Sequence, residues 1–195
     1  QGWSADALPL DVTDLTAFRN AISEAEPYEI FVNNAGTNRP KPFVDVPPQD
    51  FDAIMALNVR AAFFAAQAVV RRLLMAKHQG SIINVSSQMG HVGAPNRPVY
   101  CASKWAMEGF SRAMAIELGP HGIRVNTLCP TFIETPLART FLADETFRES
   151  VVAKIKLGRI GTVNDLMGAA VFLASDASAL MTGSSLIIDG GWTAD

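Results

Sequence analysis

Short apolar segments alternate with longer segments of helical periodicity, and this alternation constrains the fold of the chain most strongly. Such an order is typical of a parallel sheet covered by helices, because parallel strands need long crossover connections. We therefore expect an α/β fold with a doubly wound parallel sheet in three layers, built as one domain over residues 1–195. The predicted strands are 29–36, 81–87, 123–129 and 184–191, and the predicted helices are 47–80, 99–122 and 162–175.

The segment 131–160 follows a predicted strand end and mixes turn residues with weak helical periodicity. Two interpretations are open at this point. The segment is either a mobile lid over a substrate site or a plain excursion along the surface.

Charge and cysteine content narrow the classes of partner. The formal charge of −3 and the pI near 5.6 argue against nucleic-acid binding, because no basic stretch would neutralise a run of phosphates. Cys101 and Cys129 have neither metal-ligand spacing nor a paired framework, so we predict no metal site and a reducing compartment. No apolar run approaches the roughly 18–20 residues of a membrane span, and the first residues show no signal pattern. A cytoplasmic protein with a small-molecule partner is predicted, without nucleic acid or membrane.

Tyr100 and Lys104 are four residues apart within one predicted helix, in the stretch YCASK. This spacing places both side chains on one helix face, where the cation would lower the pKa of the phenol. Taken alone, such a pair is common on helix surfaces. Polar residues also follow the predicted strands, and the carboxyl ends of parallel strands form the usual ligand crevice. These polar stretches are LDV (10–12), NNAG (33–36), NVSS (84–87) and CPTFIET (129–135).

Four features occur in a fixed order: NNAG at 33–36, Ser87 placed 13 residues before Tyr100, YxxxK at 100–104, and DGG at 189–191. In this order the chain resembles the short-chain dehydrogenase/reductase family over essentially its whole length. The resemblance implies a Rossmann-like oxidoreductase that interconverts a secondary alcohol and a ketone with NAD or NADP. It assigns the general acid/base role to Tyr100, and to Lys104 a lowering of the Tyr100 pKa and a bond to the nicotinamide ribose. Ser87 would hold the substrate oxygen, and Asn58 would hold a water in a proton relay.

The resemblance also implies a set of cofactor contacts. Asp11 and Val12 would meet the adenine, and the alternative for Asp11 is that it starts a turn with Thr13 and Asp14. Asn33 would pack beside the cofactor or tie neighbouring backbones together, and both roles are open. The complete predicted cofactor set is Asp11, Val12, Asn33, Ala35, Gly36, Tyr100, Lys104, Pro130, Ile133 and Thr135.

Two departures from the family pattern stand out. The family usually has Pro-Gly after the third predicted strand, whereas this chain has Pro130-Thr131, which suggests altered substrate contacts. The family also opens with two βα units and a glycine-rich turn that binds pyrophosphate, and the given sequence begins after them. Either a preceding part of the protein lies outside this sequence or the protein lacks it. A sheet without those strands would expose an unpaired edge and apolar helix faces.

Several functions are compatible with these features. The predicted pocket is polar, which favours a sugar, polyol or hydroxy-acid substrate; its polar residues are Asn38, Arg39, Gln88, His91 and Asn96. One alternative is a 3-oxoacyl carrier-protein reductase, which would need a basic patch from Arg39 and Arg112. Another is a non-catalytic, truncated interaction module. By resemblance, the helices that carry Asn58 and Tyr100 would form the interface of a homotetramer or homodimer.

Overall fold

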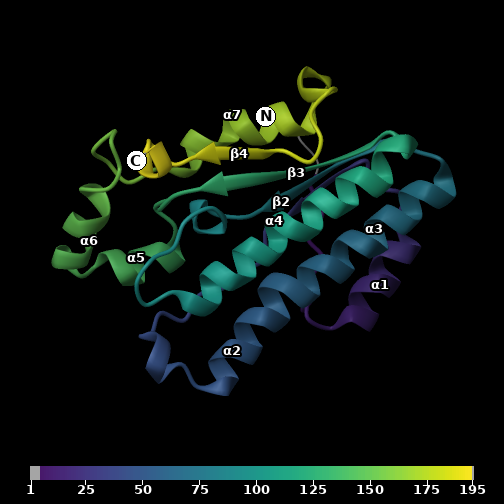
Figure 1. Ribbon diagram of the computed structural model, residues 1–195. Helices are drawn as coiled ribbons and strands as arrows, with labels where there is room; N and C mark the ends of the chain where they lie inside the picture. Colours follow the sequence, from purple (N-terminus) through teal and green to yellow (C-terminus); the bar gives the residue numbers. More distant parts are fainter. Residues whose placement is uncertain (1–4, 195) are drawn as a thin grey trace.

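Four parallel strands form the centre of the molecule, which the computed structural model describes for residues 5–194, apart from the Leu137 side chain. The sheet order is β1-β2-β3-β4, and every pair is parallel (Figure 1). All four predicted strands are present, and the α/β fold with a parallel sheet is confirmed. The strand bounds are β1 Ile30–Asn33, β2 Gly80–Val85, β3 Ile123–Pro130 and β4 Ser185–Ile188.

Helices cover both faces of this sheet. In Figure 1, α3 and α4 lie on one face with α1 packed beyond α3, and α7 lies on the other face. The α-helices are α1 Leu15–Glu24, α2 Pro48–Met55, α3 Ala62–Ala76, α4 Pro98–Leu118, α5 Pro136–Leu142, α6 Glu145–Val152 and α7 Val163–Ala174. The short 3-10 helices are η1 Phe43–Asp45, η3 Gln88–Gly90, η4 Gly119–His121, η5 Asp176–Ser178 and η6 Trp192–Ala194, while η2 Ala56–Ala61 is a π-helix.

The prediction of one continuous α-helix over 47–80 is wrong in two respects. The π-helical turn η2 separates α2 from α3, and α3 ends at Ala76 because Lys77 adopts a left-handed conformation with φ of 57°. A π-turn inserts an extra residue into the helix and often occurs at functional sites. Here it contains Asn58, one of the predicted catalytic residues.

The same helical stretch, 48–76, is long and apolar enough to cross a membrane by length and composition, contrary to the sequence-based expectation. Half of its most apolar part is buried inside the fold. Its inward residues Ala66, Val69 and Leu73 pack on the sheet, so the apolar character has a structural use within this domain.

The core consists of two clusters, one on each face of the sheet. Ile82 points into the cluster beneath α3 and α4, whereas the next residue, Ile83, points to the cluster beneath α7 with Leu128 and Leu173. Both isoleucines are fully buried because successive strand residues face opposite sides of a sheet that is covered twice.

Strand β1 lies at the edge of the described sheet, where it pairs with β2 alone among residues 5–194. Its side chains Ile30 and Val32 are about half exposed, at 51% and 47%. The exposed apolar edge expected from the sequence is therefore present.

Helix α1 was not predicted from the sequence. Asp14 caps its first turn by accepting hydrogen bonds from the backbone N–H groups of Thr16 and Ala17. Its apolar side packs toward the sheet, with the ring of Phe18 edge-on to that of Phe31.

Candidate active site

A cavity of about 470 Å³ lies at the carboxyl ends of β1, β2 and β3, where the sheet geometry directs the loops. Segments from five parts of the chain meet there, including the start of α4 and the segment that carries α5. Seven of the predicted site residues line it: Gly36, Ser87, Tyr100, Lys104, Pro130, Ile133 and Thr135.

The Tyr100 and Lys104 side chains share the first turns of α4, as their spacing predicts. The Lys104 ammonium lies 5.6 Å from the centre of the Tyr100 ring and donates a hydrogen bond to the Val85 carbonyl at 2.8 Å. Ser87 lies at the end of β2, where its hydroxyl donates to the Gln88 side chain and accepts from the Met89 N–H. The structure thus brings two hydroxyl groups and one cation to a single cavity.

The electrostatics of the pair differ from the prediction. Burial raises the pKa of Tyr100 above its ordinary value, although a hydrogen bond with Ser87 and the charge of Arg97 act to lower it. The expectation of a lowered Tyr100 pKa is therefore wrong for this structure, because desolvation outweighs the nearby charges. Burial also lowers the pKa of Lys104 to about 8, while Cys129 and Glu108 act to raise it.

Asn58 is fully buried in η2 and joins three segments around the cavity. Its side-chain N–H₂ donates to the Thr37 carbonyl at 2.9 Å and to the Ser103 hydroxyl at 3.0 Å, and its oxygen accepts from the Thr37 N–H at 2.8 Å. Ser103 in turn donates to the Tyr100 carbonyl. Asn58 therefore fixes the loop after β1 against the end of α4 that lines the cavity.

The remaining predicted residues do not line this cavity. Asn33 donates to the Ala62 carbonyl at 2.8 Å and to the Asn84 side chain at 3.1 Å, so it ties β1 to α3 and β2. Asp11 is exposed and accepts from both the N–H and the hydroxyl of Thr13, which is the turn that the sequence left open. Val12 and Ala35 are also outside the lining.

Comparison with known proteins places the chain in a family. A model described as enoyl-(acyl carrier protein) reductase matches residues 1–193. The D-erythrulose reductase of Gallus gallus is 38% identical over 187 residues, which are 96% of this chain and 76% of that enzyme. The gluconate 5-dehydrogenase of Gluconobacter oxydans is 36% identical over 197 residues, 99% of this chain and 77% of that protein.

A solved structure agrees with these relatives. The crystal structure of a gluconate 5-dehydrogenase from Burkholderia cenocepacia in complex with NADP and tartrate superposes with a TM-score of 0.92. The two sequences are 36% identical, and the matched region covers 95% of this chain and 74% of the Burkholderia cenocepacia chain. The chain belongs to the short-chain dehydrogenase/reductase family. It is an oxidoreductase that acts on CH–OH groups with NAD or NADP.

The cavity of this short-chain dehydrogenase/reductase fits the nicotinamide end of such a cofactor. A Cβ at Gly36 would lie 3.4 Å from the Asn58 side-chain oxygen and 3.9 Å from the Lys104 ammonium. The glycine therefore keeps space open directly beside the cation, where a ribose hydroxyl could approach.

The polar residues expected around the substrate divide into two groups. Asn38 and Gln88 line the cavity, whereas His91, Arg39 and Asn96 do not. Arg39 forms an ion pair with Asp50 at 2.8 Å. His91 lies 3.5 Å from the Cys129 sulfur and 3.7 Å from a Glu108 oxygen, one helical turn beyond Lys104 along α4, and it is not part of the cavity lining.

Sequence reasoning missed Arg97, which lines the cavity and is only 9% exposed. Its position three residues before Tyr100, at the helix start, was the available signal, because i and i+3 side chains share a helix face. The departure at Thr131 is also part of the cavity, where its hydroxyl accepts from the Gln88 side chain at 3.1 Å.

Proposed function

We propose that the protein reversibly oxidises a secondary alcohol of a sugar-type substrate to a ketone, by hydride transfer to NAD or NADP. The observation that carries this proposal is the lining of one cavity by the hydroxyl groups of Ser87 and Tyr100 and the ammonium of Lys104. The relatives support the substrate class, since D-erythrulose, xylulose and gluconate appear in their names.

Tyr100 acts as the general acid/base of the proposed reaction. Its raised pKa keeps the phenol protonated at neutral pH, which is the form that gives a proton to a carbonyl oxygen during ketone reduction. During alcohol oxidation the same oxygen takes the proton back. Ser87 holds the substrate oxygen by donating its hydroxyl hydrogen as that oxygen gains negative charge.

Lys104 stabilises the anionic form of Tyr100 through its charge, because its ammonium lies over the phenol ring. Asn58 is proposed to hold a water behind Lys104 in the proton relay implied by the family resemblance. Its side chain also fixes Thr37, which lines the cavity.

Residues at the ends of β1 and β3 are proposed to hold the cofactor. When bound, the nicotinamide ring supplies the hydride acceptor or donor. Lys104 would bind the ribose hydroxyls, Gly36 would allow their close approach, and Pro130, Ile133 and Thr135 would line the nicotinamide side. Asp11 and Val12 remain proposed adenine contacts.

The Tyr100→Phe variant tests this proposal in the full-length protein. We expect the wild type to reduce NAD⁺ or NADP⁺ with polyols or sugar acids, and the variant to lose roughly 10³-fold in kcat. The loss follows because phenylalanine keeps the ring but cannot carry the proton. Wild-type turnover that survives in Tyr100→Phe would contradict the assignment, and Tyr28→Phe serves as the control at an exposed tyrosine.

The carrier-protein reductase alternative gains no support from the two arginines proposed for it. Arg39 binds Asp50, and Arg112 lies 4.0 Å from Glu108. Both cations therefore lie beside carboxylates of the protein itself, which weakens the basic patch that this alternative would need from them.

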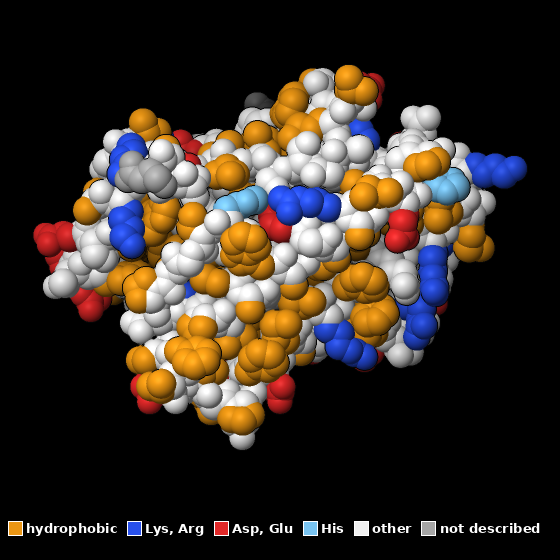
Figure 2. All heavy atoms as spheres, in the orientation of Figure 1, with side chains coloured by type: hydrophobic (Ala, Val, Ile, Leu, Met, Phe, Trp, Pro, Cys, Tyr) orange, Lys and Arg blue, Asp and Glu red, His pale blue; other side chains and the backbone are white. Residues whose placement is uncertain are grey.

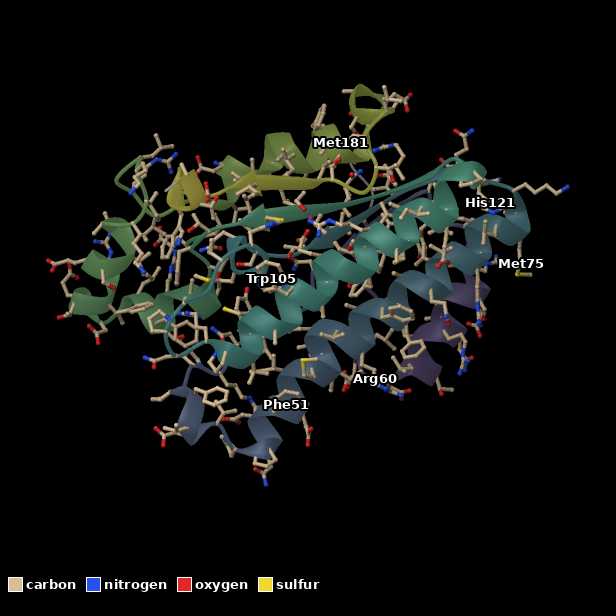
Figure 3. The ribbon with its side chains drawn as sticks, in the orientation of Figure 1. Phe51, Arg60, Met75, Trp105, His121 and Met181 are labelled. Carbon is tan, nitrogen blue, oxygen red and sulfur yellow. The ribbon has the colours of Figure 1, made fainter. Side chains whose placement is uncertain are left out.

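We further propose a homotetramer, or at least a homodimer, formed through α2–α4. Apolar side chains gather on this face in Figure 2, and Phe51 and Trp105 point outward from α2 and α4 in Figure 3. Phe51 is 47% exposed and Trp105 is 53% exposed, which is costly for a monomer. Light scattering that gave the mass of a single chain would refute the proposal. A cytoplasmic location is also proposed, supported by the two free cysteines.

A further inference from the structure

Arg97 is a buried cation without a carboxylate partner in the described part of the chain. The side chain is nine-tenths buried, lines the substrate cavity, and takes part in no ion pair or side-chain hydrogen bond among residues 5–194. Burial lowers the pKa of Arg97 from its ordinary value, which reflects the cost of removing the guanidinium from water. A buried charge of this kind normally has a partner, because desolvation is otherwise uncompensated.

Two aromatic rings hold the guanidinium in place. Its central carbon lies 5.2 Å from the centre of the Phe132 ring and 5.7 Å from that of Phe147, and the two rings pack edge to face. These contacts offset part of the desolvation cost, but the flat faces leave the N–H groups of the fork without acceptors. Phe132 and Phe147 therefore orient the Arg97 side chain but do not neutralise its charge.

The backbone turn before α4 sets the position of the Arg97 side chain. Asn96 has φ of 60°, in the left-handed region that few residues other than glycine and asparagine tolerate well. Its carbonyl accepts a hydrogen bond from the Lys41 N–H at 2.9 Å, which joins this turn to the loop after β1. Arg97 follows directly as the N-cap residue of α4.

The other polar side chains of the cavity differ from Arg97. The side-chain oxygen of Asn38 has no hydrogen-bond partner, but it is buried in the cavity wall. Gln88, by contrast, already binds both Ser87 and Thr131. The cavity thus offers a free cation besides the hydroxyl groups of Ser87 and Tyr100, which suits an acid that also carries hydroxyl groups.

We infer that Arg97 forms an anion subsite that binds a carboxylate of the substrate, so that the substrate is a hydroxy acid or keto acid of the sugar class. The inference rests on the proposed oxidoreductase function. A guanidinium suits this role because its parallel N–H groups match the two carboxylate oxygens.

The matched substrates D-gluconate and D-glucitol test the inference, since they share their chain of hydroxyl groups and differ in one terminal carboxylate. In the full-length enzyme we expect a preference for gluconate in kcat/KM. Arg97→Met is expected to lower the ratio of kcat/KM for gluconate to that for glucitol by about 10- to 100-fold, mainly through KM. Arg97→Lys should retain part of the preference because it keeps the charge and loses the fork.

The ratio matters because Arg97 also acts on the pKa of Tyr100. Any change at Tyr100 affects both substrates alike and cancels in the ratio, whereas the loss of a carboxylate partner does not. Arg148→Met is the matched control, since Arg148 directly follows Phe147 in α6 and its side chain is half exposed.

The outcomes separate the inference from the proposed function. Equal turnover of gluconate and glucitol, with an unchanged ratio in Arg97→Met, would overturn the carboxylate subsite while the oxidoreductase function stands. If neither compound, nor any other secondary alcohol, is oxidised, the proposed function fails, and calorimetric binding of tartrate decides the subsite. Tartrate binding that is weakened at least tenfold in Arg97→Met supports it, and binding of equal strength in both proteins overturns it.

Discussion

Two buried polar clusters lie one turn apart on α4, and they differ in where their hydrogen bonds go. The first contains Tyr100 and Lys104 and opens into the cavity. The second surrounds Glu108, which is only 2% exposed and accepts hydrogen bonds from Thr127 at 3.0 Å and Ser185 at 2.6 Å. Both clusters place ionisable groups in the interior. The free-energy cost of removing these groups from water must be offset by other interactions.

In the Glu108 cluster, hydrogen bonds within the fold offset this desolvation cost. The Cys129 thiol donates to the second Glu108 oxygen at 3.3 Å, and burial raises the pKa of Cys129 to about 12, which keeps this donor protonated. The ligand atoms of His91, Glu108 and Cys129 lie within 4.8 Å of one another, but hydroxyl and thiol donors already satisfy the carboxylate. This cluster joins α4 to β3 and β4 through hydrogen bonds within the fold.

The cluster of Tyr100 and Lys104 keeps hydrogen-bond donors that the fold does not use. Of the three donors on the Lys104 ammonium, one is used by the Val85 carbonyl, and the ring of Tyr100 supplies a cation–π contact. A buried polar group that is satisfied by the fold indicates a structural role, whereas one that faces a cavity with free donors indicates a ligand. The contrast predicts opposite effects of mutation on activity and on stability.

The largest effect is expected from Lys104→Met. Methionine fills a similar volume without a charge, so kcat should fall roughly 10³-fold through the loss of Tyr100 stabilisation and cofactor contact. The free energy of unfolding should stay the same or rise, because the buried ammonium no longer has to be desolvated. Steady-state kinetics and urea denaturation measure the two quantities. A clear loss of stability with retained activity would contradict the difference in role between the two clusters.

Glu108→Ala should show the reverse pattern. It leaves two hydroxyl groups and a thiol without their acceptor, so we expect the free energy of unfolding to fall by about 3 kcal/mol. Any loss of kcat should be much smaller than for Lys104→Met. Glu117→Ala, at an exposed position of the same helix, is the control and should change stability by less than about 0.5 kcal/mol. Equal stability of the two variants would show that the Glu108 cluster is not structural.

Much of this fold could be predicted from the sequence because its strands are apolar runs with polar ends. The lining of the cavity by Ser87, Tyr100 and Lys104 was also predictable, since their order along the chain resembles a known pattern. The roles of these three residues in catalysis remain proposals. Helix α1 was missed because its start depends on a cap at Asp14 rather than on a long apolar stripe.

Other features depend on contacts between distant parts of the chain. The π-turn that presents Asn58 forms where this side chain bonds both the loop after β1 and α4, and no local pattern records those bonds. The burial of Arg97 depends on Phe132 and Phe147, which follow it by more than 30 residues. The pKa of Tyr100 was predicted in the wrong direction because spacing shows the neighbouring charge but not the depth of burial.

The smallest predicted effect is a pH dependence of stability that comes from Lys104. The pKa of Lys104 is about 8 in the folded protein, against an ordinary value of 10.5, so the unfolded chain binds more protons between these values. The contribution of Lys104 to stability is therefore fully present above pH 10.5 and is lost as pH falls through 8. Between about pH 7.5 and pH 9, wild type should gain about 1 kcal/mol relative to Lys104→Met.

The difference between the two proteins is the quantity to measure, because Cys129 acts in the opposite direction. Its raised pKa makes the folded state lose stability as the unfolded thiol ionises from about pH 9 upward, and this happens equally in both proteins. Urea denaturation at several pH values gives the difference directly. A difference that does not change with pH would mean that Lys104 keeps its ordinary pKa, and hence that the cluster of Tyr100 and Lys104 is better solvated than its burial implies.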